Sequence, residues 1–242
     1  MINQSTREQI KKKIIETVGD LLAKSELDIS KKEDNTLVTE IDLVVSNIFK
    51  EHLSPLVNFY SEEDHDKLEF PSFILDPIDG TRELIKRIPE CAVSLGYLDD
   101  KGLGHGWGWI FNPFTGLEIN CQDSFIHLEG RAEGKLQGMV SRSEWKRGLY
   151  AGYDELKLIL IPKGSIAFKL ALLATGAIDF VITKRPKSIW DIAAGSILCR
   201  KRGIHLYQQK QELNKLSEKR LDGPLLWCKP SDKDLLFDQF QF

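Results

Sequence analysis

The sequence predicts a mixed α/β protein in which helices and sheets are stacked in layers. Residues 5–24 carry apolar side chains at helical spacing. Residues 91–98 and 104–110 are β-like and are joined by a hairpin signal at 99–102. Strand-like and helix-like segments alternate in the second half of the chain, which is typical of α/β layering.

The remaining elements of the first half follow from the same patterns. A second helix is predicted near residues 42–53, and a short strand at 57–60 precedes an acidic loop. An apolar strand is expected to stop at two aspartates, Asp76 and Asp79, and a short helix over 82–88 stops before a proline. Residues 117–120 return as a strand after a turn.

Two domains are expected, an N-terminal α+β domain over residues 1–130 and a C-terminal α/β domain over 131–242. A glycine-rich, charged stretch, residues 129–138, is the predicted crossing between them. The second domain should contain, in order, a strand from Gly138, a helix over 165–175, a strand over 177–183 and a helix after Asp191. The tail from Leu206 onward is assigned only as the end of this domain.

The composition is that of an ordinary soluble protein, and it argues against several classes of protein. The net charge of −3 argues against a general nucleic-acid binder. No apolar run approaches the roughly 20 residues that a membrane-spanning helix needs. The cysteines are scattered without a C-x-x-C pair, so reduced thiols and a cytoplasmic location are expected. They are Cys91, Cys121, Cys199 and Cys228.

The most informative motif is Asp-Pro-Ile-Asp-Gly-Thr at residues 76–81. Asp76 and Asp79 follow a predicted buried strand, and carboxylate oxygens fixed in this way suit hard cations such as Mg²⁺. Gly80 and Thr81 can open a helix whose unpaired N–H groups bind phosphate. Metal and phosphate would then meet, as metal-assisted phosphate ester hydrolysis requires. Asp-Pro and Asp-Gly also form ordinary turns, so the motif alone leaves a surface turn open.

Three further acidic segments accompany this motif. Glu62 lies in the acidic loop 61–64, which by itself is equally typical of a solvated surface. Asp42 and Asp191 each stand at the start of an apolar, helix-like segment, where an aspartate can serve merely as a helix cap. The combination and its order are more specific than any one segment.

Together these motifs resemble the inositol monophosphatase superfamily of Mg²⁺-dependent phosphatases. D-P-I-D-G-T and W-D-x-A-A-G, here Trp190–Gly195, carry the resemblance, which covers roughly residues 5–205. It implies stacked layers of helix, sheet, helix, sheet and helix, with the active site between two halves. It also implies inhibition by Li⁺ and, by analogy with the inositol branch, a homodimer.

The resemblance further implies a metal ligand set. One Mg²⁺ is expected on Glu62, Asp76 and the backbone carbonyl of Ile78. A second is expected on Asp76, Asp79 and Asp191, so that Asp76 bridges the pair. Some family members hold a third, weaker ion near Glu62. Cations of this kind neutralise a dianionic phosphate ester and lower the pKa of water.

The same resemblance assigns the proton transfer and the phosphate contacts. Thr81 and Asp42 would take the proton of the attacking water, with Asp42 orienting a hydroxyl that has no basicity of its own. The Gly80 and Thr81 amides would hold the phosphate oxygens. The displacement should be in line and without a phosphoenzyme, because no histidine or cysteine lies in any motif.

Three features point to the substrate. The segments 82–87 and 61–64 resemble the bacterial 3′(2′),5′-bisphosphate nucleotidase branch, and Lys169 occupies the place of a lysine in that branch. Lys184 stands where the inositol branch has a substrate-binding glutamate, and Arg185 follows it. A lysine prefers an anion to a sugar hydroxyl, so these cations suit a second phosphate, although a solvated basic loop explains them equally well.

One feature favours the other branch. Gly164 and Ser165, candidate substrate contacts, begin a segment with the spacing of the inositol branch. We therefore expect a small phosphorylated substrate, with adenosine 3′,5′-bisphosphate ahead of inositol phosphates and other small sugar phosphates. A relative of weak activity that only binds a metal or a ligand is a further alternative.

Overall fold

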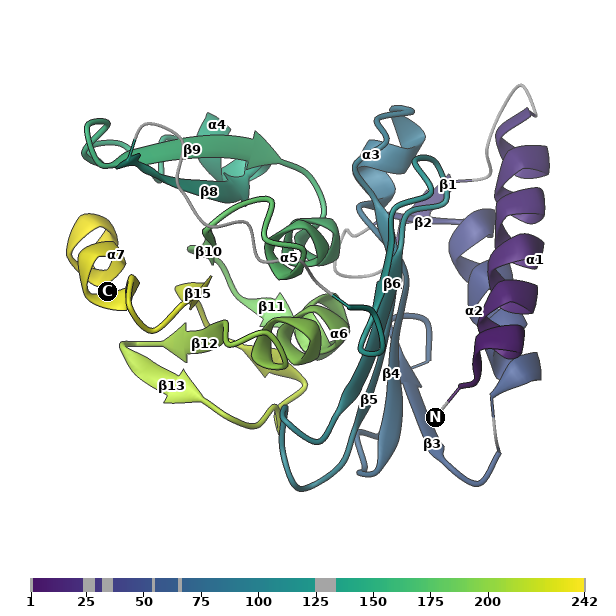
Figure 1. Cartoon of the computed structure of the whole chain (residues 1–242). Helices are drawn as coiled ribbons and strands as arrows, with labels where there is room; N and C mark the ends of the chain where they lie inside the picture. Colours follow the sequence, from purple (N-terminus) through teal and green to yellow (C-terminus); the bar gives the residue numbers. More distant parts are fainter. Residues whose placement is uncertain are drawn as a thin grey trace.

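The computed structural model stacks five layers in the order helix, sheet, helix, sheet, helix (Figure 1). It describes residues 2–23, 29–31, 37–53, 55–64, 67–124 and 134–241. The first layer consists of α1 (Gln4–Ala23) and α2 (Glu40–His52). A small hairpin of β1 (Ile29–Lys31) and β2 (Leu37–Thr39) leads into α2. The predicted order of layers is confirmed.

The second layer is a five-stranded sheet of order β3-β4-β5-β6-β7. Its strands are β3 (Asn58–Ser61), β4 (Ser72–Asp79), β5 (Ala92–Leu98), β6 (Trp107–Phe111) and β7 (Glu118–Asn120). Side chains along β4 alternate between its faces. Phe73 and Leu75 pack with the apolar stripes of α1 and α2, whereas Ile74 packs with the central helices. The one-turn helix α3 (Thr81–Ile85) follows β4 directly.

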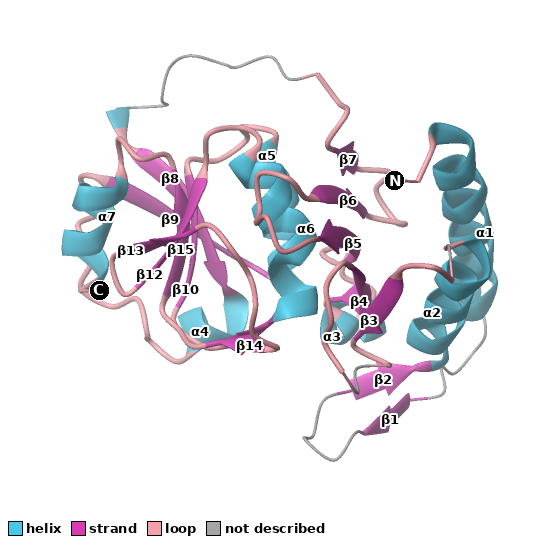
Figure 2. Ribbon diagram, turned by 90° about the horizontal axis from the view of Figure 1, so that it is seen from below, coloured by secondary structure: helices cyan, strands magenta, loops and turns pink. Residues whose placement is uncertain are grey.

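The central layer consists of α5 (Ile166–Ala174) and α6 (Ile189–Arg200), which lie between the two sheets (Figure 2). The second sheet has the order β13-β12-β15-β10-β8-β9. Its strands are β8 (Leu136–Ser141), β9 (Leu158–Lys163), β10 (Phe180–Thr183), β12 (His205–Gln208), β13 (Gln211–Leu213) and β15 (Leu225–Cys228).

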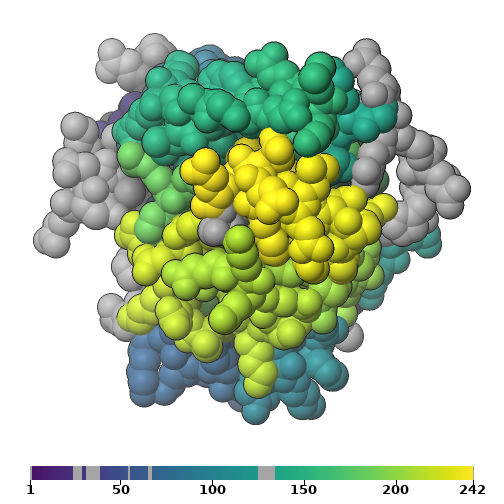
Figure 3. Space-filling view, turned by 90° about the vertical axis from the view of Figure 1, so that its left-hand side faces the viewer, coloured from purple at the N-terminus to yellow at the C-terminus, as the bar shows by residue number. Residues whose placement is uncertain are grey.

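The last layer is α7 (Lys233–Phe240), whose Leu236, Phe237 and Phe240 pack on the outer face of the second sheet. Figure 3 shows these C-terminal residues, in yellow, between the segment around β8 and β9 and that around β12 and β13. Three short elements complete the chain: α4 (Arg142–Lys146), β11 (Lys187–Ser188) and β14 (Arg220–Leu221). Within the described part, no helix has the length and apolar character needed to cross a membrane.

The strand before the motif stops at the two aspartates, as predicted: β4 ends at Asp79 and has an irregular pairing to β5 between Asp76 and Asp79. The prediction for residues 129–138 was wrong in part, because β8 begins at Leu136 within the stretch predicted as a domain crossing. Residues 125–133 lie outside the described ranges, and the division into domains near residue 130 stays a prediction. The four cysteines are unpaired thiols, as expected.

Close packing of α6 on the first sheet depends on a glycine in β6. A Cβ atom at Gly108 would lie 2.7 Å from the Ala194 carbonyl oxygen, which is backbone and cannot move aside. We expect Gly108→Ala to lower the free energy of unfolding by about 1–3 kcal/mol through overpacking. Gly19→Ala is the matched control: nothing lies within 4 Å of its Cβ. Because Gly19 is in α1, alanine should add up to about 1 kcal/mol. Urea denaturation measures both, and equal effects would contradict this account.

Candidate active site

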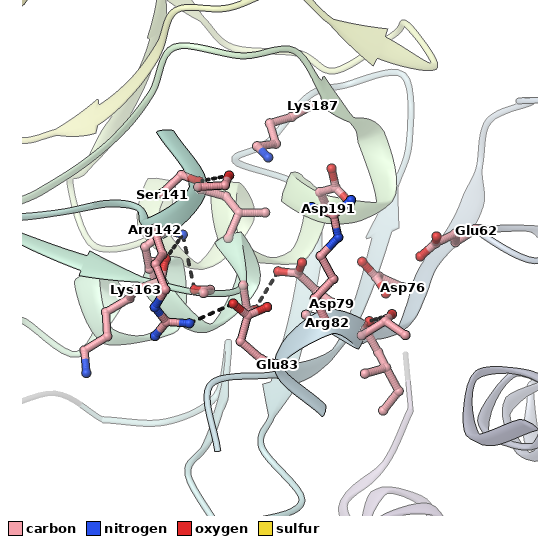
Figure 4. Close-up of a pocket in the computed structure, with 18 residues that line it drawn as sticks. Glu62, Asp76, Asp79, Arg82, Glu83, Ser141, Arg142, Lys163, Lys187 and Asp191 are labelled. Carbon is pink, nitrogen blue, oxygen red and sulfur yellow. Dashed lines mark hydrogen bonds and ion pairs between the residues drawn. The ribbon is translucent and has the colours of Figure 1, made fainter. Parts of the chain in front are cut away.

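A cavity of about 320 Å³ opens between the two halves of the molecule, at the end of β4. Its walls come from β4 and α3 on one side and from α4, β9, α5, β11 and α6 on the other (Figure 4). The lining residues are Glu62, Asp76, Ile78, Asp79, Gly80, Thr81, Arg82, Glu83, Ser141, Arg142, Ser143, Lys163, Gly164, Ser165, Ile166, Lys169, Lys187 and Asp191. Most of the residues proposed from the sequence therefore share one cavity.

Three carboxylates form the acidic centre of this cavity. Asp76, Asp79 and Asp191 each offer an oxygen, and these atoms lie within 4.8 Å of one another. Residues three apart on a regular strand would face opposite sides of the sheet. The pairing irregularity of β4 between Asp76 and Asp79 allows both to reach the cavity. The feature absent from the sequence prediction is thus what brings the motif's two aspartates together.

Asp76 is the most deeply placed of the three. It is 1% exposed, and its Oδ1 atom has no hydrogen-bond partner among the described residues. Burial, followed by the charges of Glu62 and Asp79, raises the pKa of Asp76 well above its usual range. In the view of Figure 4, Asp76 lies between Asp79 and Glu62. A buried carboxylate without a donor is costly, and a cation is the group that would offset this cost.

Asp191 is held at the start of α6 by a capping box. Ser188 is the N-cap residue, and its backbone N–H donates to Asp191 Oδ2 at 3.1 Å. Burial raises the pKa of Asp191 to about 6, with Asp79 adding to the effect and Lys187 opposing it. The helix-cap and metal-ligand interpretations are therefore compatible, because one oxygen serves the capping box while the carboxylate faces the cavity.

Asp42 shows the same arrangement at the start of α2. Thr39 is the N-cap, and its backbone N–H and hydroxyl donate to Asp42 Oδ2 at 2.8 and 2.6 Å. The Thr81 hydroxyl lies 3.4 Å from Asp42 Oδ1 and 3.1 Å from the Ile78 carbonyl oxygen. The structure thus brings Thr81 and Asp42 together across 39 residues. Gly80, in the left-handed conformation at φ +98°, forms the N-cap of α3 beside them.

Asp79 is bound from across the cavity by the first turn of α5. The Ser165 hydroxyl donates to Asp79 Oδ2 at 2.6 Å, and the Ala167 amide donates to the same oxygen. Ser165 adopts φ +44°, which is uncommon outside glycine, and its hydroxyl oxygen accepts from the Phe168 amide. Gly164 lies so close to Glu83 that a Cβ atom added at Gly164 would be 2.4 Å from the Glu83 carboxyl carbon. Ser165 and Gly164 therefore join the second half of the chain to the motif.

The cations proposed from the sequence divide into two groups. Lys169 is 3% exposed and donates to the Lys163 and Gly164 carbonyls at 3.3 and 3.2 Å, and burial lowers its pKa to about 8. Lys184 instead directs its amine to the Phe240 carbonyl and ring. Neither Lys184 nor Arg185, the next residue, is part of the described cavity wall.

Arg185 and Lys184 are held by the same residue, Glu144. Both backbone amides donate to the buried carboxylate of Glu144, at 3.1 and 3.0 Å, and Thr183 donates its hydroxyl at 2.8 Å. Glu144 is 1% exposed. The turn before β11 is thereby fixed, and the residue that it presents to the cavity is Lys187.

The sequence reasoning missed one network on the wall. Arg142 forms ion pairs with Glu83, at 2.8 Å, and with Glu90. Lys163 also pairs with Glu90, at 2.9 Å. These partners are 52 to 73 residues apart along the chain, and no local motif marks them. The network links the two halves and neutralises two of the cavity's cations.

The chain is similar to characterised phosphatases over most of its length. The 3′(2′),5′-bisphosphate nucleotidase CysQ of Buchnera aphidicola is 27% identical over 191 residues, covering 70% of both chains. Inositol monophosphatase 3 of Solanum lycopersicum is 27% identical over 201 residues, covering 69% of this chain and 71% of the relative. Both names describe phosphatases, which agrees with the carboxylate site.

Solved structures confirm the fold. The Thermotoga maritima IMPase superposes with a TM-score of 0.74 at 21% identity, covering 97% of this chain and 96% of the other. CysQ from Bacteroides thetaiotaomicron superposes with a TM-score of 0.65 at 21% identity, covering 90% and 93%. The sequence model of the inositol monophosphatase family matches residues 3–227. This chain belongs to the inositol monophosphatase family and is a phosphatase.

Proposed function

We propose that the protein hydrolyses phosphomonoesters with Mg²⁺ and a water nucleophile, and that its substrates are 3′(2′),5′-bisphosphate nucleotides such as adenosine 3′,5′-bisphosphate. The observation that carries the reaction is the cluster of Asp76, Asp79 and Asp191, with the partnerless Oδ1 atom of Asp76 at its centre. An all-oxygen donor set suits Mg²⁺. When bound, Mg²⁺ would neutralise the phosphate and lower the pKa of water.

The residues that would hold two such ions are those expected from the sequence. They are Glu62, Asp76, the Ile78 carbonyl, Asp79 and Asp191. The Ile78 carbonyl oxygen lies 3.1 Å from the Thr81 hydroxyl, and a carbonyl oxygen has a second lone pair that could bind a cation. Because Ser165 and Ala167 both donate to Asp79 Oδ2, the other Asp79 oxygen would be the one available to a cation.

Proton transfer would be carried out by Thr81 and Asp42. Thr39 holds Asp42 Oδ2, which leaves Oδ1 turned toward the Thr81 hydroxyl. The single Thr81 proton can be donated either to this carboxylate or to the Ile78 carbonyl. If the carbonyl held a cation, the proton would go to Asp42, and the Thr81 oxygen could accept a hydrogen bond from the attacking water. The Gly80 and Thr81 amides would contact the phosphate oxygens. Because α3 is only one turn long, the N–H groups themselves and not a long helix dipole would supply this contact.

The nucleotide substrate is favoured by charge and by the relatives. Lys187 lines the cavity, and a cation suits a second phosphate better than a sugar hydroxyl. Several curated relatives are named 3′(2′),5′-bisphosphate nucleotidase, at 25–28% identity. The inositol-type spacing after Gly164 and the relatives named inositol monophosphatase support a second candidate, an inositol or other small sugar phosphatase.

Phosphate release tests these candidates directly. Adenosine 3′,5′-bisphosphate and inositol 1-phosphate are assayed in parallel, with Mg²⁺ and after EDTA, and Asp79→Asn serves as the inactive control. Preference for the bisphosphate supports the nucleotidase assignment, and preference for the inositol ester supports the second candidate. Release from neither, by protein shown to bind Mg²⁺, would favour other sugar phosphates or a relative that only binds a ligand.

Lithium should inhibit turnover, because the site of Asp76, Asp79 and Asp191 is the one for which Li⁺ would compete. A solved structure of staphylococcal inositol monophosphatase-1 is described as an inhibitory complex soaked in LiCl. We expect inhibition to weaken as Mg²⁺ is raised, and initial rates over a Li⁺ series at two Mg²⁺ concentrations measure this. Turnover unchanged by Li⁺ would argue against this arrangement of the second metal site.

Magnesium affinity should depend on pH through the same carboxylates. Burial raises the pKa of Asp191 to about 6 and that of Asp76 well above its usual range, so protons occupy the metal-free site in acid. Binding Mg²⁺ must release them. The apparent Kd should therefore fall as the pH rises, by up to about tenfold per pH unit for each proton released. The part due to Asp191 should level off above about pH 7. Calorimetric titrations at several pH values test this, and a Kd independent of pH would contradict it.

A further inference from the structure

The cavity wall carries equal numbers of acidic and basic side chains. Five acidic and five basic side chains are among its described lining residues. The basic ones are Arg82, Arg142, Lys163, Lys169 and Lys187. Two divalent cations on the acidic centre would add four positive charges, whereas one phosphomonoester carries at most two negative charges. A ligand with a second phosphate would match this surplus.

Three of the five cations are already occupied by the protein itself. Arg142 is paired with Glu83 and Glu90, and Lys163 is paired with Glu90. Lys169 is buried and bonded to two backbone carbonyls. A ligand phosphate could use these groups only by competing with their present partners, so they are poor candidates for a second-phosphate contact.

The other two cations lack such partners. Of the side chains that the structure describes on this wall, Arg82 and Lys187 form neither a hydrogen bond nor an ion pair. Arg82 is exposed and follows Thr81 at the start of α3. Lys187 stands in β11, four residues before Asp191, and its backbone pairs with Leu221 of β14. Figure 4 shows both side chains near Asp191, Lys187 extending from β11 and Arg82 from α3.

We propose that Arg82 and Lys187 form a subsite for the non-scissile phosphate, and that this subsite selects ligands with two phosphates over ligands with one. The inference rests on the proposed phosphatase reaction and deepens it. Arg82 can present a planar fork to phosphate oxygens, and Lys187 contributes a compact charge from the other half of the molecule. The bonds from the Lys184 and Arg185 amides to Glu144 fix the backbone of the turn from which Lys187 projects.

A matched substrate pair isolates this contact. Adenosine 3′,5′-bisphosphate and adenosine 3′-monophosphate share the scissile ester and differ only in the second phosphate. The measured quantity is the ratio of kcat/KM for the bisphosphate to that for the monophosphate. We expect Arg82→Gln and Lys187→Gln each to lower this ratio by about tenfold, as the loss of a charge-assisted contact would. Lys187→Arg keeps the charge and should retain most of the ratio.

Two further variants sharpen the comparison. Lys229→Gln removes an exposed lysine outside the cavity and should leave the ratio unchanged. Lys184→Gln tests one of the cations proposed from the sequence, and a loss of the ratio there but not in Lys187→Gln would overturn the proposal. Binding of the bisphosphate, measured by calorimetry with Mg²⁺ in a Thr81→Ala background of slow turnover, should weaken on adding Lys187→Gln.

The outcomes separate this inference from the reaction on which it rests. If the wild-type protein releases phosphate from neither adenosine ester nor from inositol 1-phosphate, the proposed function itself fails. If it hydrolyses both adenosine esters and the ratio is the same in Arg82→Gln and Lys187→Gln, the reaction stands and the subsite is wrong. In that case Lys187 would serve only to balance the charge of Asp191.

Discussion

Replacing Asp76 by asparagine is expected to lower Mg²⁺-dependent phosphate release by at least about a thousandfold, or about 4 kcal/mol of transition-state stabilisation. It should also make the metal-free protein more stable. Asp76 is buried beside Asp79, Asp191 and Glu62, and burial and these charges disfavour its ionised form. An asparagine of the same shape carries no charge and can donate its N–H groups to the neighbouring carboxylates, so about 1–3 kcal/mol of stability should be gained.

Opposite changes in activity and stability distinguish a metal site from a structural one. Urea denaturation with and without Mg²⁺ measures the stability, and phosphate release measures the activity. Asp100→Asn, an exposed change of the same chemistry, should alter neither. If Asp76→Asn lowered the stability of the metal-free protein, Asp76 would have a structural partner that the described contacts do not contain. If turnover survived, Asp76 would not be the bridging ligand.

The parts of the site that could be predicted from sequence are those whose signal is local. The apolar stripe with Ile10, Ile14 and Val18 predicts α1 because a helix repeats every 3.6 residues. Asp42 and Asp191 belong to capping boxes, in which the N-cap and the acid stand three residues apart. Such patterns need no knowledge of the rest of the chain.

Other parts depend on contacts between distant segments. The irregular pairing of β4 with β5 lets both Asp76 and Asp79 point to one cavity. This irregularity depends on how the two strands pair and not on the sequence of β4 alone. The bond from Ser165 to Asp79 spans 86 residues, and nothing in either segment marks it. Similarly, β15 of the tail pairs with β10, which lies far upstream, and β12 joins the sheet through β15, so the tail could be assigned only to the end of the domain.

The turn between β10 and β11, with its several cations, shows the same dependence on distant contacts. Lys184 and Lys187 are both cationic and three residues apart, and the sequence offers no means to decide which faces the site. Thr183 ends β10, and the backbone then turns toward Glu144 before β11 begins. That turn, fixed by a buried carboxylate from α4, places Lys187 on the wall and sends Lys184 to the end of α7.

Replacing Thr81 by alanine is expected to lower kcat by about a hundredfold to ten-thousandfold, the range of general acid–base contributions. The affinity for Mg²⁺ should change by less than about twofold, because we propose that the hydroxyl contacts the attacking water and not an ion. Thr81→Ser keeps the hydroxyl and should retain most of the activity. Steady-state kinetics and calorimetric Mg²⁺ titrations measure the two effects separately.

The partner of Thr81 supplies a decisive comparison. If Thr81 acts by handing its proton to Asp42, Asp42→Asn should cost about as much in kcat, and the double variant should cost little more than either. Asp42 also caps α2, so Asp42→Asn should in addition lower stability by about 1 kcal/mol, which Thr81→Ala should not. Additive losses in kcat would mean that the two residues act independently. If Thr81→Ala weakened Mg²⁺ binding as much as it lowered kcat, the threonine would be a metal ligand and would not act on the water.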